Sequence, residues 1–177
     1  MRTARKRTVM KSNIVLIGMP GCGKSTVGVV LAKNLGYKFV DVDIIIQERE
    51  GKLLSEIIDE RGFDGFIKAE EEACLSVDCA NSVIATGGSA VYGKEAMKHF
   101  KEIGAVVYIK LSFDEIEERL GDLHQRGVAM HGDMTLKDLY NERTPLYEQY
   151  ADVVCEADGM VLRDVVMSIK EKTRGIL

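Results

Sequence analysis

Short apolar runs alternate with segments of helical periodicity along most of the chain. The runs that predict short buried strands lie at 13–17, 39–40, 82–85, 105–109 and 153–154. Helical patterns follow them, beginning with 24–35 directly after the first run. A regular alternation of strand and helix is typical of βαβ units, whose parallel strands form one sheet covered by helices on both faces. The pattern therefore predicts a single α/β domain over residues 1–177.

Two segments do not fit a simple alternation. The segment at about 44–79 is helical throughout and too long for a simple crossover, so we interpret it as a helical substrate-binding region. The segment at about 121–134 is polar and carries glycines between two helical patterns, which is the position of a lid. Either segment taken alone also fits ordinary surface structure, so the motifs that accompany them decide the interpretation.

Composition and charge exclude several classes of function. The 177 residues are 46% hydrophobic and 29% charged, as in ordinary globular domains, and no apolar run is long enough to span a bilayer. A net charge of −4 gives no general attraction to nucleic acid or anionic membrane. Residues 1–11 are basic without an apolar stretch, and we interpret them as a short disordered leader. We expect a cytoplasmic monomer with no nucleic-acid or membrane partner, whose four cysteines are reduced thiols.

The strongest motif occupies residues 18–26, where Gly-Met-Pro-Gly-Cys-Gly-Lys-Ser-Thr matches G-x-x-x-x-G-K-[ST] between a predicted strand and a predicted helix. Its glycines let backbone N–H groups converge on phosphate oxygens, and the helix N-terminus favours their negative charge. Lys24 is expected to contact the β- and γ-phosphates of ATP, and the Ser25 hydroxyl to bind Mg²⁺. The candidate ATP-binding residues of this loop are Gly21, Cys22, Gly23, Lys24, Ser25 and Thr26.

The loop by itself does not separate kinases from other nucleotide hydrolases. The chain contains no Asn-Lys-x-Asp sequence, which a GTPase needs to recognise guanine. It is also short for a mechanical ATPase. A small phosphotransferase is the class that remains.

Carboxylates and glycines follow the next two predicted strands. Asp41 and Asp43 come at a strand end where parallel sheets bind their ligands. Near a phosphate site, one carboxylate helps to hold hydrated Mg²⁺ and the other orients or deprotonates the acceptor hydroxyl. A lone Asp-x-Asp equally fits a turn or a helix N-cap. Thr86-Gly87-Gly88-Ser89 follows the third strand, where paired glycines permit close approach to a ligand, although a plain tight turn is an alternative.

Three arginines complete the candidate set. Phosphoryl transfer spreads negative charge over the transferred group, and a lid arginine stabilises that charge. Arg126 lies in the predicted lid, and Arg143 begins Arg-Thr-Pro-Leu-Tyr, a helical stretch that we expect Pro145 to break. Arg119 is a further candidate. Taken singly, each arginine is better explained as a surface charge, and only the order of the motifs favours function for Arg126 and Arg143.

The order of these motifs resembles that of the shikimate kinase family, from about residue 13 to the C-terminus. The motifs that carry the resemblance are the phosphate loop, Asp41-Val42-Asp43, Gly87-Gly88-Ser89 in place of a usual triple glycine, Arg126, and Arg143-Thr-Pro-Leu-Tyr. This family is similar in fold to nucleoside monophosphate kinases. The resemblance therefore implies a three-layer P-loop fold with a five-stranded parallel sheet, a helical substrate-binding region and a lid.

The resemblance also implies roles on the nucleotide side of the site. Ser25 would bind Mg²⁺, with Asp41 close to the water shell of the metal. Lys24 and Arg126 would contact the phosphates of ATP and act in catalysis, and Arg119 would lie beside the adenine.

On the acceptor side, the resemblance implies that Asp43 contacts the acceptor hydroxyl and acts as its base. Gly87 and Gly88 would lie against the acceptor, and Arg143 would bind its carboxylate. Glu70 would be a further contact, although it belongs to a run of three glutamates that is equally explained as a solvated helix face.

The chain departs from the family pattern in the acceptor region. The family usually carries Gly-Glu-x-x-Phe-Arg, whose arginine binds the shikimate carboxylate, and residues 62–67 here read Gly-Phe-Asp-Gly-Phe-Ile. Ile67 cannot donate a hydrogen bond, and losing one charge-assisted partner costs about 1.5–3 kcal/mol. Lys68 points about 100° away from position 67 on a helix and lacks the guanidinium fork. Ser89 adds a side chain where the family has glycine.

Three hypotheses of function follow. The first, which the closeness of the whole motif set to the family favours, is phosphorylation of shikimate to shikimate 3-phosphate, a step of aromatic amino acid biosynthesis, with a rebuilt pocket. The second is a kinase for another small hydroxylated metabolite, which the apolar Ile67 favours. The third is a nucleotide-binding regulatory protein without catalysis, which is disfavoured by the retention of Lys24, Ser25, Asp41, Asp43 and Arg126.

Overall fold

The fold is built on one parallel sheet of five strands. The computed structural model describes residues 11–120 and 128–177. The strands are β1 (Asn13–Ile17), β2 (Lys38–Asp41), β3 (Ser82–Ala85), β4 (Gly104–Lys110) and β5 (Val153–Glu156). Their order across the sheet is β2-β3-β1-β4-β5, and every neighbouring pair is parallel. The predicted α/β class and all five predicted strands are confirmed.

The central strands owe their position to unbroken apolar sequence. Every residue of β1 is buried, and Val15 pairs with Ile84 of β3 on one side and Val106 of β4 on the other. A parallel strand between two neighbours is covered by helices on both faces, so it carries no polar alternation. The polar Asn13 at the start of β1 is satisfied by donating to the carbonyls of Cys79 and Ile103.

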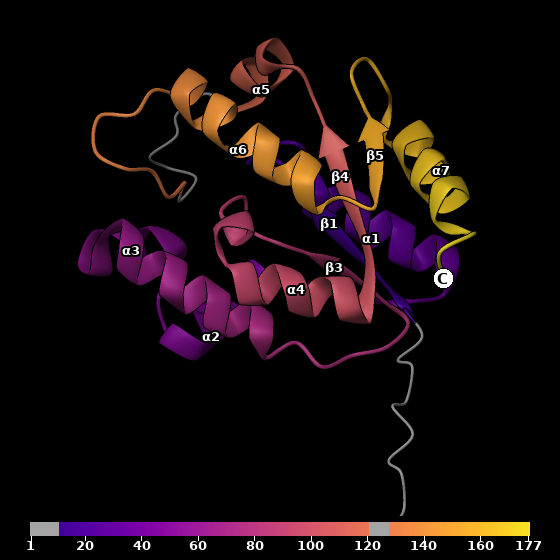
Figure 1. Ribbon diagram of the computed structural model, residues 1–177, viewed down its shortest axis with the longest axis horizontal. Coiled ribbons are helices and arrows are strands. Elements are labelled where there is room, and N and C mark those ends of the chain that lie inside the picture. Colours follow the sequence, from indigo (N-terminus) through magenta and orange to yellow (C-terminus); the bar gives the residue numbers. More distant parts are fainter. Residues whose placement is uncertain (1–10, 121–127) are drawn as a thin grey trace, which may run out of the picture.

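Helices cover both faces of the sheet (Figure 1). They are α1 (Lys24–Leu35), α2 (Val42–Glu50), α3 (Leu54–Leu75), the short 3₁₀ helix η1 (Ala90–Tyr92), α4 (Lys94–Ile103), α5 (Phe113–Leu120), α6 (Leu136–Tyr150) and α7 (Leu162–Thr173). The first and last, α1 and α7, pack against each other on one face, while α4 and α6 contact β4 from the other. The predicted first helix has the predicted bounds.

The helical region expected at about 44–79 consists of α2 and α3, which pack against each other at one end of the sheet (Figure 1). Gly62 interrupts α3 with a φ of 69° and a ψ of −177°, so the helix is kinked there. Helix α3 contacts η1 and α4, and Phe66 and Ala73, which follow the kink, are buried. This packing fixes the helix face that carries Glu70.

The expectation that Pro145 breaks a helix is wrong. Helix α6 runs without interruption from Leu136 to Tyr150 with Pro145 inside it. Proline removes one backbone N–H, whose partner would have been the carbonyl of Asn141. Both residues are exposed, so that carbonyl is open to solvent and is not left buried without a partner. The helix therefore continues, and Arg143 and Tyr147, one turn apart, both face the protein interior.

The segment between α5 and α6 is described only from residue 128 onward. Arg126, and with it the first half of the predicted lid, lies outside the described residues. In the described part, Thr135 caps α6 by accepting from the backbone N–H of Asp138, whose side chain accepts from the N–H of Thr135 in return.

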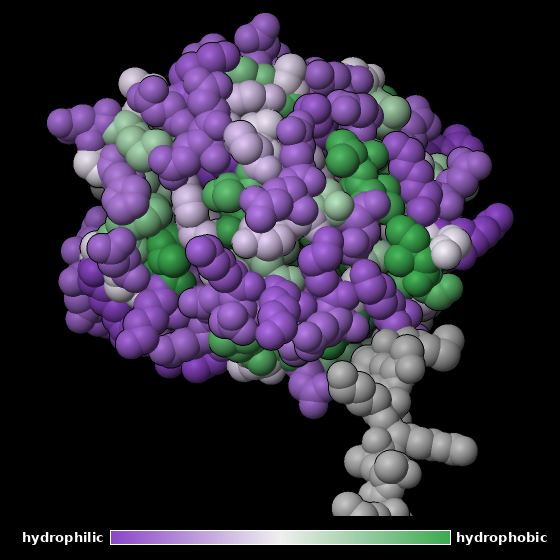
Figure 2. Space-filling model, viewed as in Figure 1, coloured by the Kyte–Doolittle hydropathy of each residue, from purple (hydrophilic) through white to green (hydrophobic). Residues whose placement is uncertain are grey.

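The face seen in Figure 2 is largely hydrophilic, with apolar residues in separate patches. Among the described residues, no helix is long and apolar enough to cross a membrane.

Candidate active site

The phosphate loop connects the end of β1 to the start of α1. Gly23 caps α1 in the left-handed region with a φ of 92°, which a side chain would oppose. The Lys24 side chain is buried, and its Nζ donates to the backbone carbonyls of Gly18 at 2.8 Å and Met19 at 2.9 Å. The loop thus wraps around the ammonium group at the N-terminus of a helix, where anions are favoured.

Asp41 serves both as a helix cap and as a member of the site. Its Oδ1 accepts from the backbone N–H of Asp43 at 3.0 Å and so caps α2, while its Oδ2 accepts from the Ser25 hydroxyl at 2.7 Å. Both interpretations of the Asp-x-Asp motif are therefore compatible with one geometry. The residues described include no cluster of three histidine, cysteine or acidic side chains that could hold a metal alone. A metal ion here would need oxygen ligands from the nucleotide or water.

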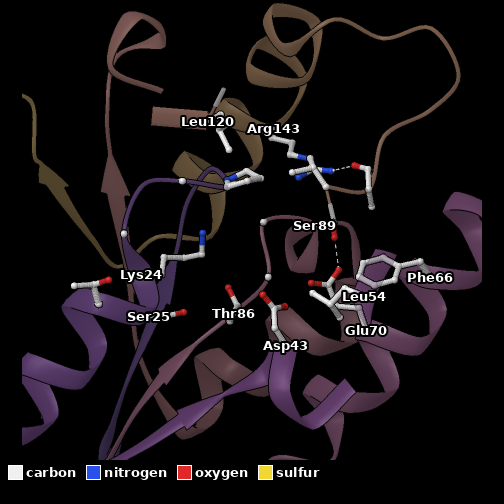
Figure 3. A pocket seen from close by; sticks show the side chains of 18 residues that line it. Lys24, Ser25, Asp43, Leu54, Phe66, Glu70, Thr86, Ser89, Leu120 and Arg143 are labelled. Atoms are coloured by element: carbon white, nitrogen blue, oxygen red, sulfur yellow. Dashed lines mark hydrogen bonds between the residues drawn. The ribbon is translucent and has the colours of Figure 1, made fainter. Parts of the chain in front are cut away.

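A cavity of about 360 Å³ opens beside the phosphate loop. Figure 3 shows Lys24 and Ser25 at one end, Arg143 along one wall, and Asp43 and Glu70 on the wall facing it. The other residues that line it are Pro20, Gly21, Gly23, Thr26, Leu54, Phe66, Thr86, Gly87, Gly88, Ser89, Leu120, Val128 and Ala129. The cavity therefore combines an anion-binding loop, two carboxyl groups and one guanidinium.

The two carboxyl groups have raised pKa values because they are withdrawn from water. Burial, together with the nearby charge of Asp41, raises the pKa of Asp43 to about 6, against the opposing charge of Lys24. Burial raises the pKa of Glu70 to about 7, against the hydrogen bond from Ser89 and the charges of Arg143 and Lys24. A carboxyl group with a pKa near neutrality is suited to accept and release a proton.

Arg143 is fully buried in α6 and held by two neighbours. Its Nε donates to the Tyr92 hydroxyl at 3.2 Å, and one terminal nitrogen donates to the carbonyl of Ala129 at 2.5 Å. The guanidinium also lies over the Tyr92 ring, 5.2 Å from its centroid. Its other terminal nitrogen lies toward Gly88, 3.1 Å from where a Cβ on that glycine would stand. The guanidinium is thus oriented before any ligand binds.

Two tyrosines that support the site were not predicted from the sequence. Tyr92 orients Arg143, and Tyr147 donates through its hydroxyl to the Gly88 carbonyl at 2.6 Å, which braces the glycine turn. The spacing of Arg143 and Tyr147 was a usable signal, because residues four apart share a helix face. No local pattern pointed to Tyr92, which lies in η1, 51 residues before Arg143.

An aromatic cluster connects α3 to η1 and to the segment after residue 128. Phe63 of α3 lies edge-on to Tyr92, with ring centroids 5.7 Å apart, and against His131, with centroids 3.6 Å apart. His131 belongs to the described part of the predicted lid. The cluster therefore joins α3, η1 and that segment.

A second cavity, of about 240 Å³, lies on the other side of the phosphate loop. Arg119 lines it together with Cys22, Ile109, Ala157, Met160, Leu162 and Val165. Gly23 and Thr26 line both cavities, so the loop separates two adjoining spaces. Arg119 itself pairs with Glu115 at 3.0 Å.

The structure brings most of the predicted site residues into one place. Gly21, Gly23, Lys24, Ser25, Thr26, Asp43, Glu70, Gly87, Gly88 and Arg143 line the first cavity. Cys22 and Arg119 line the second cavity. Ile67 is half-buried and packs against the hydrophobic core, and it does not line the first cavity.

The topology and this site define a class of protein. A phosphate loop at the carboxyl end of the central parallel strand, beside a cavity with a buried carboxylate and guanidinium, is the arrangement of a P-loop phosphotransferase.

The comparisons with known proteins give the family. The family model for shikimate kinase matches residues 20–174. A shikimate kinase of Clostridium botulinum is 37% identical over 163 residues, which cover 92% of this chain and 97% of that protein. A shikimate kinase of Francisella tularensis subsp. novicida is 36% identical over 165 residues, covering 91% and 94%. The chain belongs to the shikimate kinase family.

Solved structures agree with this assignment. The shikimate kinase of Acinetobacter baumannii in complex with shikimate has a TM-score of 0.85 and 29% identity, with 96% of this chain and 97% of that chain covered. The shikimate kinase of Aquifex aeolicus has a TM-score of 0.80 and 33% identity, with 92% and 96% covered. The predicted family, P-loop fold and enzyme class, a phosphotransferase with an alcohol acceptor, are confirmed. Membership implies ATP as the donor, used with a divalent metal ion.

Proposed function

We propose that this protein transfers the γ-phosphoryl group of Mg-ATP to the 3-hydroxyl of shikimate. The observation that carries the proposal is the cavity beside the phosphate loop, in which Asp43 and Arg143 face each other. An acceptor with a hydroxyl at one end and a carboxylate at the other suits that pair. The shikimate kinases among its relatives support the choice of acceptor.

ATP would occupy both cavities, with its phosphates at the loop between them. Gly23 and Thr26 line both spaces, so a nucleotide in the second cavity would direct its phosphates toward the first. Lys24 would exchange the carbonyls of Gly18 and Met19 for phosphate oxygens, because an ammonium group prefers an anionic partner. Arg119 would lie beside the base. Arg126, on sequence grounds alone, would contact the phosphates.

The metal is proposed to be Mg²⁺, held by Ser25 with help from Asp41. These residues supply oxygen ligands only, which is the chemistry that Mg²⁺ prefers, and few protein ligands are needed because it keeps waters and nucleotide oxygens. Bound there, Mg²⁺ would neutralise charge on the β- and γ-phosphates. The Ser25 hydroxyl now donates to Asp41 and would turn its lone pairs to the metal.

Asp43 is proposed to be the base that receives the proton of the acceptor hydroxyl. Its pKa is raised to about 6, which makes it a better proton acceptor than an exposed aspartate. Because this value is still below 7, the group is mostly ionised at neutral pH. Lys24, on the neighbouring loop, favours its ionised form. Arg143 would bind the carboxylate at the opposite end of the acceptor. The backbone of Gly87 and Gly88 would lie against the ring of shikimate.

A second acceptor remains a candidate because of one observation. Arg143 is the only arginine among the described residues that line the cavity, and position 67 is an isoleucine packed on the core. With two acidic groups and one guanidinium, the pocket would also suit a less anionic, more hydroxylated metabolite. The region formed by α2, α3 and the segment after residue 128 would enclose either acceptor.

The test is ADP release from Mg-ATP with shikimate, measured beside a panel of small hydroxy acids and polyols. Saturable turnover that is fastest on shikimate is expected, with formation of shikimate 3-phosphate verified by mass spectrometry. Lys24→Ala serves as the control for contaminating kinases. Turnover of another acceptor with none on shikimate would replace the first candidate by the second.

A further inference from the structure

The carboxyl group of Glu70 is only half satisfied by the protein. The residue is fully buried on α3, and its Oε2 accepts from the Ser89 hydroxyl at 2.5 Å. Its Oε1 has no hydrogen-bond partner within the described parts of the chain. A buried carboxyl oxygen without a partner is costly to keep, and this one borders the cavity beside the glycine turn. The free oxygen therefore points to a ligand.

Ser89 is fixed in the position from which it reaches Glu70. It is 4% exposed, follows the glycine turn after β3, and caps η1 with its backbone carbonyl accepting from the N–H of Tyr92 at 3.0 Å. The turn and the short helix hold its backbone from both sides. Its hydroxyl therefore locks one oxygen of the carboxyl group and thereby sets the direction of the other (Figure 3).

The cations around Glu70 do not hydrogen-bond to it. Arg143 of α6 and Lys24 of α1 lower its pKa from a distance, and Asp43 of α2 raises it. Arg143 donates hydrogen bonds to Tyr92 and Ala129, and the hydrogen bonds of Lys24 stay within the phosphate loop. Ser89 is therefore the one direct donor to Glu70 in the described structure.

The apolar side chain at position 67 explains why Glu70 needs a hydrogen-bond donor from elsewhere. Residues three apart on a helix are neighbours, so the side chain at 67 lies next to Glu70 on α3. An arginine at this position would place a guanidinium near that carboxyl group, whereas Ile67 is apolar and packs on the core. The helix thus gives Glu70 no donor, and the donor comes from the turn after β3.

We propose that Ser89 is a positioning residue that takes the place of a cationic side chain at position 67, holding Glu70 so that Oε1 accepts a hydrogen bond from a hydroxyl of the acceptor. Ile67 in place of the arginine of the family pattern, and Ser89 in place of its glycine, are then two substitutions that depend on each other. The ligand class is a small polyhydroxylated acceptor. This inference rests on the proposed function, because it assumes that the acceptor occupies this cavity.

A double-mutant cycle with Ser89→Ala, Ile67→Arg and the combined variant tests the coupling. Ser89→Ala is expected to raise the KM for shikimate about tenfold, since Glu70 loses a hydrogen bond to a charged group, with kcat changed less than threefold. In the Ile67→Arg background the same change should raise KM less than threefold, because the guanidinium then supplies the donor. An equal effect in both backgrounds, or an unchanged KM in Ser89→Ala, overturns the proposal.

Ser82→Ala is the matched control. Ser82 is also fully buried, but it starts β3 at the end away from the cavity, and its hydroxyl donates to the Ala80 carbonyl at 3.1 Å. Its removal should leave the KM for shikimate unchanged. A rise equal to that of Ser89→Ala would attribute the effect to loss of a buried hydroxyl in general and would overturn the proposal.

A second measurement does not depend on the acceptor. The titration of Glu70, followed by NMR of ¹³C-labelled glutamate and assigned with Glu70→Gln, should move to higher pH in Ser89→Ala, because the serine hydrogen bond favours the ionised form. An unchanged titration overturns the proposal even if shikimate is not the acceptor. Absence of turnover on shikimate in the wild type, with a shifted titration in the variant, would reject the acceptor and keep the positioning role.

Discussion

A methyl group on Gly87 is expected to damage catalysis more than folding. A Cβ at this position would lie 2.1 Å from Glu70 Oε1 and 2.9 Å from Asp43 Oδ1, where ordinary contact begins at 3.4 Å. Gly87 is not among the glycines with positive φ, so the backbone itself accepts alanine. The conflict is therefore with the two carboxyl groups, and at least one must move by about 1 Å to restore normal packing.

The size of the effect follows from that displacement. Overpacking of a buried site costs about 1–3 kcal/mol of stability, which leaves most domains folded. Moving a catalytic group by about 1 Å, by contrast, lowers the rate roughly 100-fold, because the reacting atoms leave their productive arrangement. Gly87→Ala should accordingly lose about two orders of magnitude in kcat on shikimate while melting only a few degrees lower.

The assay compares kcat at saturating Mg-ATP and shikimate with the Kd for ATP from calorimetry and with the melting temperature. ATP affinity should stay within threefold of wild type, because the atoms nearest to the added Cβ belong to Glu70 and Asp43 and not to the phosphate loop. Gly175→Ala is the control, since a Cβ there meets no atom within 4 Å. A kcat within threefold of wild type in Gly87→Ala would refute the assignment of Asp43 to the reacting end of the cavity.

Three further predictions concern charge. Lys24→Ala should lower kcat at least about 100-fold by removing a stabiliser of transferred charge; an unchanged kcat in a folded variant would contradict the phosphate-site assignment. The kcat/KM of the wild type should fall about tenfold per pH unit below about 6, because Asp43 must be ionised to act as base; an apparent pKa near 4 would remove Asp43 from that role. Because the pKa of Glu70 is raised to about 7 in the fold, its contribution to stability is full at low pH and is lost as pH rises through 7. Urea unfolding of Glu70→Gln should therefore lose roughly 3 kcal/mol less than wild type between pH 4.5 and 8, and equal losses would contradict the burial of an ionisable group there.

Much of the fold could be predicted from the sequence because the local preferences of each segment agree with its place in the folded protein. Residues 14–17 are all apolar, and the phosphate loop ends in Gly23, whose left-handed φ favours glycine, so strand, loop and helix were predicted with their observed bounds. The carboxyl ends of parallel strands meet at one edge, which is why Asp43 and the Gly87-Gly88 turn were predicted to share a site. The expected break at Pro145 failed because the lost hydrogen bond faces water, and exposure is a property of the folded molecule.

The sequence by itself determined the chemistry that this protein carries: a phosphate loop, its lysine and hydroxyl, and acidic groups at strand ends, each encoded within a few neighbouring residues. Only the tertiary structure decided how the acceptor end is built. Glu70 and Ser89 are 19 residues apart, and Arg143 and Tyr92 are 51 apart, so no local pattern records that they touch. Whether Glu70 is a solvated charge or a buried acceptor depends on which elements close over α3. Hydrogen bonding and pKa are set by those distant neighbours, because burial removes the water that would otherwise satisfy each group.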